Sequence, residues 1–228
     1  MNLPEAFIQS LQNLKGFDEA AFKAVHQSGF QLTSIRLNPK KISKGQLAMP
    51  ARPLGSLAGG HVLLEKVPWS DNGYYLSERP SFTLDPLFHA GAYYVQEASS
   101  MFLEEVLKQT IDLTKPIRIL DLCAAPGGKS TLIQSVISEQ SLLVSNEVIK
   151  TRVNILAENI TKWGADNAIV TNNDPTDFKR LPGYFDVIVV DAPCSGSGLF
   201  RKDANAINEW SENNEHSVPS ASKGFWQI

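Results

Sequence analysis

The chain has 228 residues, a formal net charge of −3 and a hydrophobic fraction of 43%, values typical of a globular protein with one large or two small domains. No apolar stretch approaches the ~20 residues that a membrane span needs, and the N-terminal sequence MNLPEAFIQS lacks the basic region and apolar core of an export signal. Only two cysteines occur, which argues against a disulfide scaffold and favours a cytoplasmic protein in a reducing compartment.

Residues 1–90 predict a small α+β module. Two amphipathic helices are expected within 4–28, with core-facing stripes formed by Phe7, Leu11 and Leu14 and by Phe17, Ala21, Phe22 and Val25. A strand is expected at 33–38, because the sequence TSIRLN alternates and then meets a proline. Residues 45–61 are predicted to be a glycine-rich loop, and residues 67–77 a hairpin around Asn72-Gly73.

From residue 91 onward the sequence predicts a joining segment and then alternating strands and helices. The joining segment covers 91–114 and includes a helix at 95–109. Strands are expected at 117–121, 142–146, 167–171 and 185–191, and helices at 130–139 and 148–163. This alternation indicates an α/β region over 115–212, with a parallel, doubly wound, Rossmann-like sheet and right-handed crossovers.

The most informative segment is DLCAAPGGK at 121–129, a glycine-rich turn between the first strand of this sheet and a helix. Open α/β sheets bind their ligands at the carboxyl ends of strands, where the backbone N–H groups of such a turn are available. The end of the segment also resembles a phosphate-binding P-loop. That motif requires a glycine where this chain has Cys123, so the P-loop interpretation fails at a required position.

Two acidic residues follow the next two strands. Glu147 stands where dinucleotide folds place an acceptor for ribose hydroxyls, although a glutamate at a helix start is also common on a surface. Asp174 follows the third strand and would lie near an adenine, but it could equally be a turn residue before Pro175. The residues alone leave both alternatives open.

The fourth strand ends in the segment DAPCSG at 191–196, which contains Asp191 and Cys194. A lone cysteine is more often an inert buried residue than a reactive one. Cys194, however, lies among proline, serine and glycine at the carboxyl end of a strand, which favours a functional role. This placement predicts a carboxylate and a thiol above the same pocket.

Together, the segments at 121–129 and 185–198 resemble motifs I and IV of the RNA 5-methylcytosine methyltransferases, the NOL/NOP/Sun family, and most closely its bacterial RsmB and RsmF branch. The resemblance implies a Rossmann-like S-adenosylmethionine-dependent methyltransferase sheet, incomplete at the C-terminus, after an N-terminal module with an RNA-binding role. It also implies that S-adenosyl-L-methionine is the cofactor and that the partner is RNA, specifically small-subunit rRNA, with neither a metal nor a membrane involved.

The resemblance assigns roles residue by residue. The implied cofactor-binding residues are Cys123, Ala124, Ala125, Pro126, Gly127, Gly128, Lys129, Glu147, Asp174 and Asp191. Asp191 is also implied to act as a proton donor or hydrogen-bond partner for the cytosine ring. Cytosine C5 is a poor nucleophile until a thiolate adds at C6. In this family a second cysteine makes that attack, and the cysteine corresponding to Cys194 assists product release.

The chain departs from the family where this attacking cysteine is expected. No Thr-Cys motif follows Trp210, and the sequence instead reads NNEHSVPSASKGFWQI to its end. Permitted codons for 217–228, read two bases on, encode CAKRVKRILAD, which resembles the missing family helix. We therefore hypothesise a frameshift that makes 213–228 an aberrant tail; the alternative is a divergent natural terminus.

Three functional hypotheses follow from the sequence. The first is an RNA cytosine-C5 methyltransferase by descent, inactive as this truncated chain. The second is a non-catalytic product that binds the cofactor or RNA weakly, and the third is a P-loop nucleotide hydrolase. The net charge of −3 is unusual for an RNA-binding protein, and the scattered basic clusters are interpreted as solvated surface. Arg201 and Lys202 are the exception, because they follow the candidate active-site loop.

Overall fold

A computed structural model describes residues 3–29, 32–42, 64–192, 197–200 and 204–210 of the chain. The chain divides into two compact units, one containing Met1–Gln31 and Ala192–Gln227 and the other Leu32–Asp191. The expectations for the 45–61 loop, for Cys194, for Arg201 and Lys202 and for the 213–228 tail lie outside the described residues.

The smaller unit is helical and has an aromatic centre. It contains α1 (Glu5–Leu11), α2 (Glu19–Gln27), the 3-10 helix η4 (Ser197–Leu199) and α8 (Ala204–Glu209). The ring of Phe7 lies edge-on to Phe200 and Trp210, at centroid distances of 5.0 and 5.6 Å. The two predicted helices are therefore present, and Phe7 and Phe22 pack against each other at 6.2 Å between ring centroids. The core prediction was wrong for Leu14 and Val25, which are 58% and 51% exposed.

The larger unit begins with an antiparallel sheet of order β2-β3-β1-β4. Its strands are β1 (Thr33–Leu37), β2 (Leu64–Lys66), β3 (Gly73–Leu76) and β4 (Tyr93–Val95). The predicted hairpin exists, but its first strand precedes residue 67, so the connection is longer than an Asn-Gly turn. The 3-10 helix η1 (Phe82–Leu84) and the short α4 (Pro86–His89) lie between β3 and β4 in the sequence.

Strand β4 corrects the prediction of a helix at 95–109. Val95 pairs with Ile35 of β1, and the helical segment starts only at the 3-10 helix η2 (Ser99–Met101), which leads into α5 (Phe102–Thr110). A short apolar run such as YYV fits either element by periodicity alone. This segment forms a strand because it pairs with the free edge of β1, and the antiparallel sheet therefore extends past residue 90.

The second sheet of the larger unit is parallel, with the order β7-β6-β5-β8. Its strands are β5 (Arg118–Asp121), β6 (Leu142–Asn146), β7 (Ala168–Thr171) and β8 (Val187–Val189). The connections contain α6 (Gly128–Val136), α7 (Lys150–Trp163) and the 3-10 helix η3 (Pro175–Arg180). This confirms the predicted parallel α/β sheet, in which the strand order reverses at β5 as it does in doubly wound folds.

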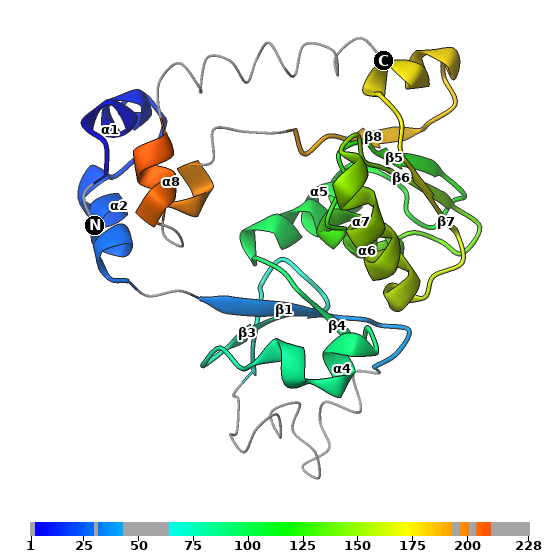
Figure 1. Cartoon of the computed structure of the whole chain (residues 1–228), viewed down its shortest axis with the longest axis horizontal. Helices are drawn as coiled ribbons and strands as arrows, with labels where there is room; N and C mark the ends of the chain where they lie inside the picture. Colours follow the sequence, from blue (N-terminus) through cyan, green and yellow to red (C-terminus); the bar gives the residue numbers. More distant parts are fainter. Residues whose placement is uncertain (1–2, 30–31, 43–63, 193–196, 201–203, 211–228) are drawn as a thin grey trace. The chain divides into compact units, whose positions relative to one another are not determined.

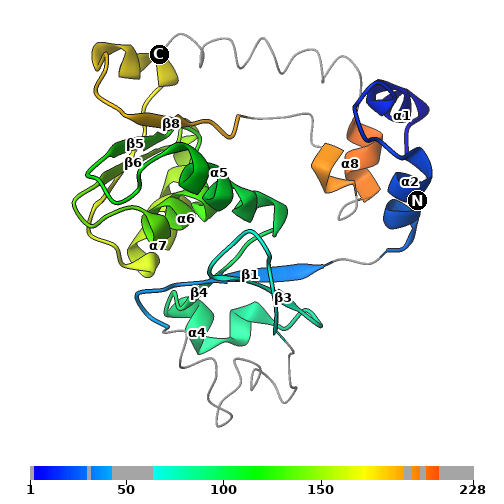
Figure 2. The same cartoon turned by 180° about the vertical axis from the view of Figure 1, so that it is seen from behind.

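Within the larger unit, α5, α6 and α7 lie between the two sheets (Figures 1 and 2). The core they share with the parallel sheet includes Met101, Ile119, Ile133 and Leu143, each fully or almost fully buried. Ile169 of β7 and Ile188 of β8 instead expose 49% and 41% of their surface. Parallel sheets are normally covered on both faces, so this exposure marks a face without full cover among the described residues.

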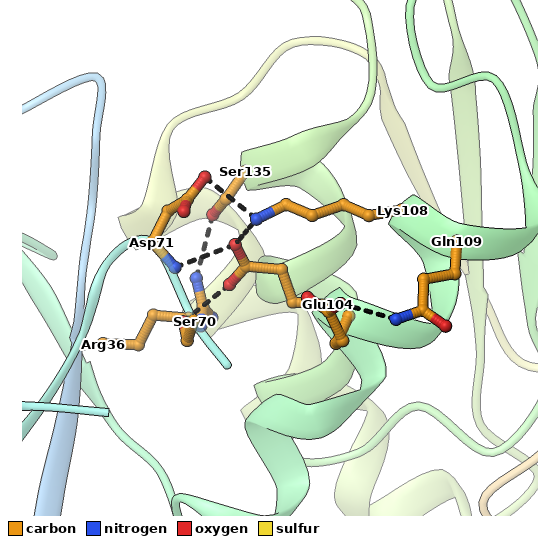
Figure 3. Close-up of polar contacts among 8 residues, drawn as sticks. Arg36, Ser70, Asp71, Glu104, Lys108, Gln109 and Ser135 are labelled. Carbon is orange, nitrogen blue, oxygen red and sulfur yellow. Dashed lines mark hydrogen bonds and ion pairs between the residues drawn. The ribbon is translucent and has the colours of Figure 1, made fainter. Parts of the chain in front are cut away.

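A fully buried arginine joins the antiparallel sheet to α6. Arg36 of β1 has no exposed surface and donates to the backbone oxygens of Gly128 and Thr131. It also donates to the Thr131 and Ser135 hydroxyls and to Gln96 Oε1 (Figure 3 shows the Ser135 contact). Its guanidinium carbon lies 4.5 Å from the centroid of the Trp163 ring. Burial lowers the pKa of Arg36 to about 9, which still leaves it charged at neutral pH.

A second contact joins the hairpin to α5. The buried carboxylate of Glu104 accepts hydrogen bonds from Ser70 Oγ and from the backbone N–H of Asp71, and it pairs with Lys108 at 2.6 Å (Figure 3). Because these partners satisfy the carboxylate, its burial is compatible with a stable fold. The antiparallel sheet is therefore fixed to the helical layer at both α5 and α6.

We expect Arg36→Lys to destabilise the protein by about 2–4 kcal/mol, because an ammonium cannot replace the planar set of donors that satisfies the buried acceptors. The matched control is Arg79→Lys, at an exposed arginine of the same sheet region, which should change stability by less than about 0.5 kcal/mol. Urea unfolding followed by circular dichroism measures both. Equal stability of the two variants would contradict the proposed importance of Arg36.

Candidate functional site

The glycine-rich turn is held in a defined conformation between β5 and α6. Gly127 has φ of 110°, a left-handed conformation that suits glycine, and it is the residue that caps α6. The Ala124 N–H donates to Asn146 O at 2.8 Å, and Asn159 Nδ2 donates to Pro126 O at 2.8 Å. The turn is therefore fixed by β6 on one side and by α7 on the other.

A cavity of about 210 Å³ lies beside this turn. It is lined by Tyr94, Val95, Gln96, Glu97, Ser100, Cys123, Ala124, Ala125, Pro126, Gly128, Lys129 and Asp191. The structure thus brings Asp191 to the same cavity as six of the seven turn residues predicted from the sequence, and only Gly127 is absent from the wall. The sequence analysis did not predict the cavity residues in and just after β4, which are Tyr94, Val95, Gln96, Glu97 and Ser100. The polar residues that directly follow the aromatic pair at 93–94 could have indicated them.

Lys129 and Asp191 form an ion pair at the wall of the cavity. Lys129 Nζ lies 2.5 Å from Asp191 Oδ2, and the two side chains are 26% and 58% exposed. Partly exposed pairs of this kind contribute little to stability, usually below about 1 kcal/mol. Because the pair is not needed for stability, its ammonium and carboxylate are available to a ligand in the cavity, one as a hydrogen-bond donor and the other as an acceptor.

Beneath the turn, Asp121 is fully buried at the end of β5. Its Oδ2 accepts a hydrogen bond of 2.6 Å from Ser130 Oγ, whereas Oδ1 has no hydrogen-bond partner among the described residues. Burial raises the pKa of Asp121 to about 6, and the Ser130 hydrogen bond opposes this rise. A buried acceptor without a partner is uncommon and often marks a functional position.

Glu147 lies under the turn, is 2% exposed and is not among the residues that line the cavity, so its role as a ribose acceptor stays a prediction. Its carboxylate accepts from the N–H of Ala125 at 3.2 Å and from that of Ile149 at 2.9 Å. Arg152 lies 3.7 Å from the same carboxylate and donates to Ala125 O. Glu147 therefore supports both the glycine-rich turn and the start of α7. A carboxylate has about four acceptor positions, so these contacts leave capacity for a ligand hydroxyl.

Asp174 is not brought to the cavity. It is exposed and caps η3, where its Oδ1 accepts from the Thr176 N–H at 2.9 Å and from the Thr176 hydroxyl at 2.6 Å. These hydrogen bonds lower the pKa of Asp174. The geometry matches the turn alternative, and a role near an adenine stays a prediction.

The thiol of Cys123 is half-buried in the cavity wall. Burial, and then the nearby carboxylates of Glu147, Asp121 and Asp191, raise its pKa to about 11. Because the thiolate is the reactive form, this thiol is a poor nucleophile at neutral pH. Cys194 lies outside the described residues.

The described residues contain neither a cluster of His, Cys, Asp and Glu suited to a metal ion nor a helix able to cross a membrane.

Comparison with protein-family models identifies this arrangement. Residues 108–222, about half of the chain, match the 16S rRNA methyltransferase RsmB/F model. The chain belongs to the 16S rRNA methyltransferase RsmB/F family. Residues 3–98 match a second model from the same family, the N-terminal domain of 16S rRNA methyltransferase RsmF.

Known members and structures agree with this assignment to the RsmB/F family. The ribosomal RNA small subunit methyltransferase F of Pectobacterium atrosepticum is 36% identical over 220 residues, covering 92% of this chain and 43% of that protein. The chain thus spans less than half the length of this relative. A methyltransferase homologue from Pyrococcus horikoshii is 26% identical with a TM-score of 0.64, covering 90% of this chain and 68% of the other.

The fold of this RsmB/F chain also matches NSun6 from Pyrococcus horikoshii with SFG. The TM-score is 0.75 at 17% identity, covering 98% of this chain and 78% of the other. At this identity the similarity establishes the fold alone.

We expect Cys123 in a Cys194→Ser variant to react with iodoacetamide roughly a hundredfold more slowly at pH 7 than a free cysteine, because its raised pKa reduces the thiolate fraction. The rate should continue to rise with pH up to about 11. Mass spectrometry of the alkylated peptide follows the reaction, with a short cysteine peptide as the reference. A rate that levels off near pH 8 would show that the surroundings do not suppress ionisation.

Proposed function

We propose that this chain is part of an S-adenosylmethionine-dependent methyltransferase that acts on C5 of a cytosine in small-subunit rRNA, in the cytoplasm. The observation that supports this proposal is the cavity in which the glycine-rich turn, Lys129 and Asp191 meet. Such turns at the carboxyl end of a first parallel strand bind nucleotide-like cofactors. Membership of the RsmB/F family supplies the reaction class and the kind of RNA.

The residues around the turn fit this cofactor. Gly127 adopts the left-handed conformation that forms the turn before α6. A Cβ on Gly128 would lie 3.4 Å from the Tyr94 ring and would partly fill the space beside the start of the helix. Asp121 Oδ1 is a buried acceptor without a partner, and Glu147 lies at the next strand end. In this proposal, Cys123 to Lys129 hold the cofactor's amino-acid end and Glu147 accepts from its ribose. Asp174 lies toward the adenine.

When bound, the cofactor supplies an activated methyl group. The protein must position the cytosine and manage its protons. Cytosine offers acceptors at its ring nitrogen and carbonyl and a donor at its amino group. We assign Asp191 to the ring: its carboxylate accepts from the cytosine amino group, and once protonated it donates to the ring nitrogen. We assign Lys129 to holding the Asp191 side chain in place.

Two cysteine roles complete the proposal. Cys123 is assigned to the cofactor turn, because its raised pKa makes it unsuited to attack. Cys194 is assigned to product release, and the thiolate that adds to cytosine C6 is assigned to a segment that this chain lacks. We further propose that 1–90 contribute RNA contacts, that 91–114 join the parts and that 115–212 form the partial methyltransferase domain, with 213–228 as an aberrant tail.

The alternative proposal is a non-catalytic chain that binds cofactor or RNA weakly. It shares the cavity and the glycine-rich turn with the first proposal. The two differ only in whether methyl transfer is completed.

We expect the chain to bind S-adenosylmethionine and Glu147→Gln to weaken this binding about ten- to a hundredfold, because a charged acceptor for ribose hydroxyls is lost. Isothermal titration calorimetry measures the dissociation constants. The control is Glu158→Gln on α7, where the carboxylate is 72% exposed and pairs only with Lys162 among the ion pairs found. Unchanged affinity in the Glu147 variant would refute the ribose assignment.

We expect the 228-residue chain to transfer no methyl group to unmodified 16S rRNA, because the attacking cysteine is absent. Incorporation of labelled methyl groups is the measurement, with the Pectobacterium relative as positive control. A gel assay for a covalent protein–RNA adduct should also be negative. Methylation that Cys194→Ser abolishes would make Cys194 the nucleophile and overturn the division of roles.

A further inference from the structure

Gln96 contributes a fixed donor to the cavity from the antiparallel-sheet side. It follows β4, is 7% exposed and lines the cavity. Arg36 Nε donates to its Oε1 at 2.8 Å. Because a guanidinium can only donate, this bond fixes the orientation of the amide. Oε1 must face Arg36, and the Nε2 donor must face the other way.

The Nε2 atom has no hydrogen-bond partner among the described residues and is shielded from solvent. It lies 3.6 Å from the position that a Cβ on Gly128 would occupy, and Tyr94 Cε1 lies 3.4 Å from the same point. Both side chains therefore lie over the first residue of α6. A buried amide donor without an acceptor costs about 1–3 kcal/mol, so an acceptor is expected to complete it in the working protein.

The position of this donor indicates the charge of its acceptor. Helix α6 has nine residues, and its first turn has N–H groups without intrahelical acceptors as well as the positive end of the helix dipole. Lys129, two residues after the cap, is already paired with Asp191 and adds no net positive charge. Gln96 Nε2 and the helix terminus together favour an anionic oxygen.

We propose that Gln96, oriented by Arg36, donates through Nε2 to the carboxylate at the amino-acid end of S-adenosylmethionine. This rests on the proposed function, because it assumes that this cofactor binds over the glycine-rich turn. The carboxylate is the cofactor's anionic group, and the glycine-rich turn provides the adjoining N–H groups. The Tyr94 ring must shift to admit it, and the hydroxyl of Tyr94 is tied only by a long hydrogen bond of 3.3 Å to Pro126 O.

The proposal makes the antiparallel sheet part of the cofactor site. Arg36 is a positioning residue, since it contacts Gln96 and the first turns of α6 rather than the cavity. Gln96 is the group that touches the ligand. The N-terminal region would thus discriminate between ligands with and without an amino-acid end.

The experiment compares two ligands by calorimetry with the full 228-residue chain. S-adenosylhomocysteine has the amino-acid end, whereas methylthioadenosine lacks it. The variants are Gln96→Met, which removes the donor, and Gln96→Glu, which replaces it with an anion but offers Arg36 a carboxylate. Gln109→Met, at an exposed glutamine of α5, is the matched control. Thermal unfolding of each variant is measured in parallel.

We expect Gln96→Met to weaken S-adenosylhomocysteine about ten- to a hundredfold and Gln96→Glu to weaken it further, while methylthioadenosine binding changes less than about twofold. The melting temperature of Gln96→Glu should not fall, because Arg36 gains an ionic partner.

Equal weakening of both ligands, or of neither, would overturn the carboxylate assignment. If the unsubstituted chain binds neither ligand, the proposed function fails as well, which distinguishes that failure from the failure of the Gln96 assignment alone.

Discussion

The buried guanidinium of Arg36 is the constraint on which the larger unit depends. Placing a cation away from water costs several kcal/mol unless hydrogen bonds compensate for the lost hydration. No ion pair to Arg36 is found among the described residues, so backbone oxygens, hydroxyls and one amide must satisfy it. All of these acceptors lie on or beside α6. The antiparallel sheet can therefore take only those positions relative to the glycine-rich turn in which all the hydrogen bonds of Arg36 are made.

This restriction explains why the cavity has walls from two sheets. Asn38, two residues after Arg36, makes a similar contact with the end of α7, since its amide donates to Trp163 O and to Gly91 O. The close approach at Gly91, where a Cβ would lie 2.1 Å from Lys162 O, leaves no room for a larger residue. The strand β4 that follows is thereby held against β1, and Tyr94 and Gln96 reach the first turn of α6.

The sequence predicted the features that depend on local patterns. The glycine pair at 127–128, the apolar strand before it and the acidic residue after β6 all follow rules of spacing, and the predicted parallel α/β sheet is confirmed by the order β7-β6-β5-β8. It could not predict the partners of Arg36, because Thr131 lies 95 positions later in the chain. Strand β4 was missed for the same reason: its identity comes from pairing with β1 and not from its own three residues.

The separation between Arg36 and its acceptors has a consequence for biosynthesis. When the ribosome has released β1, the residues that will accept its donors have not been made, and the guanidinium stays hydrated. The antiparallel sheet can then pair its strands but cannot fix itself to α6 until Ser135 has emerged, 99 positions after Arg36. Contacts of this sequence separation are slow to form. The cavity beside the glycine-rich turn closes later still, because Asp191 in its wall is made last in the larger unit.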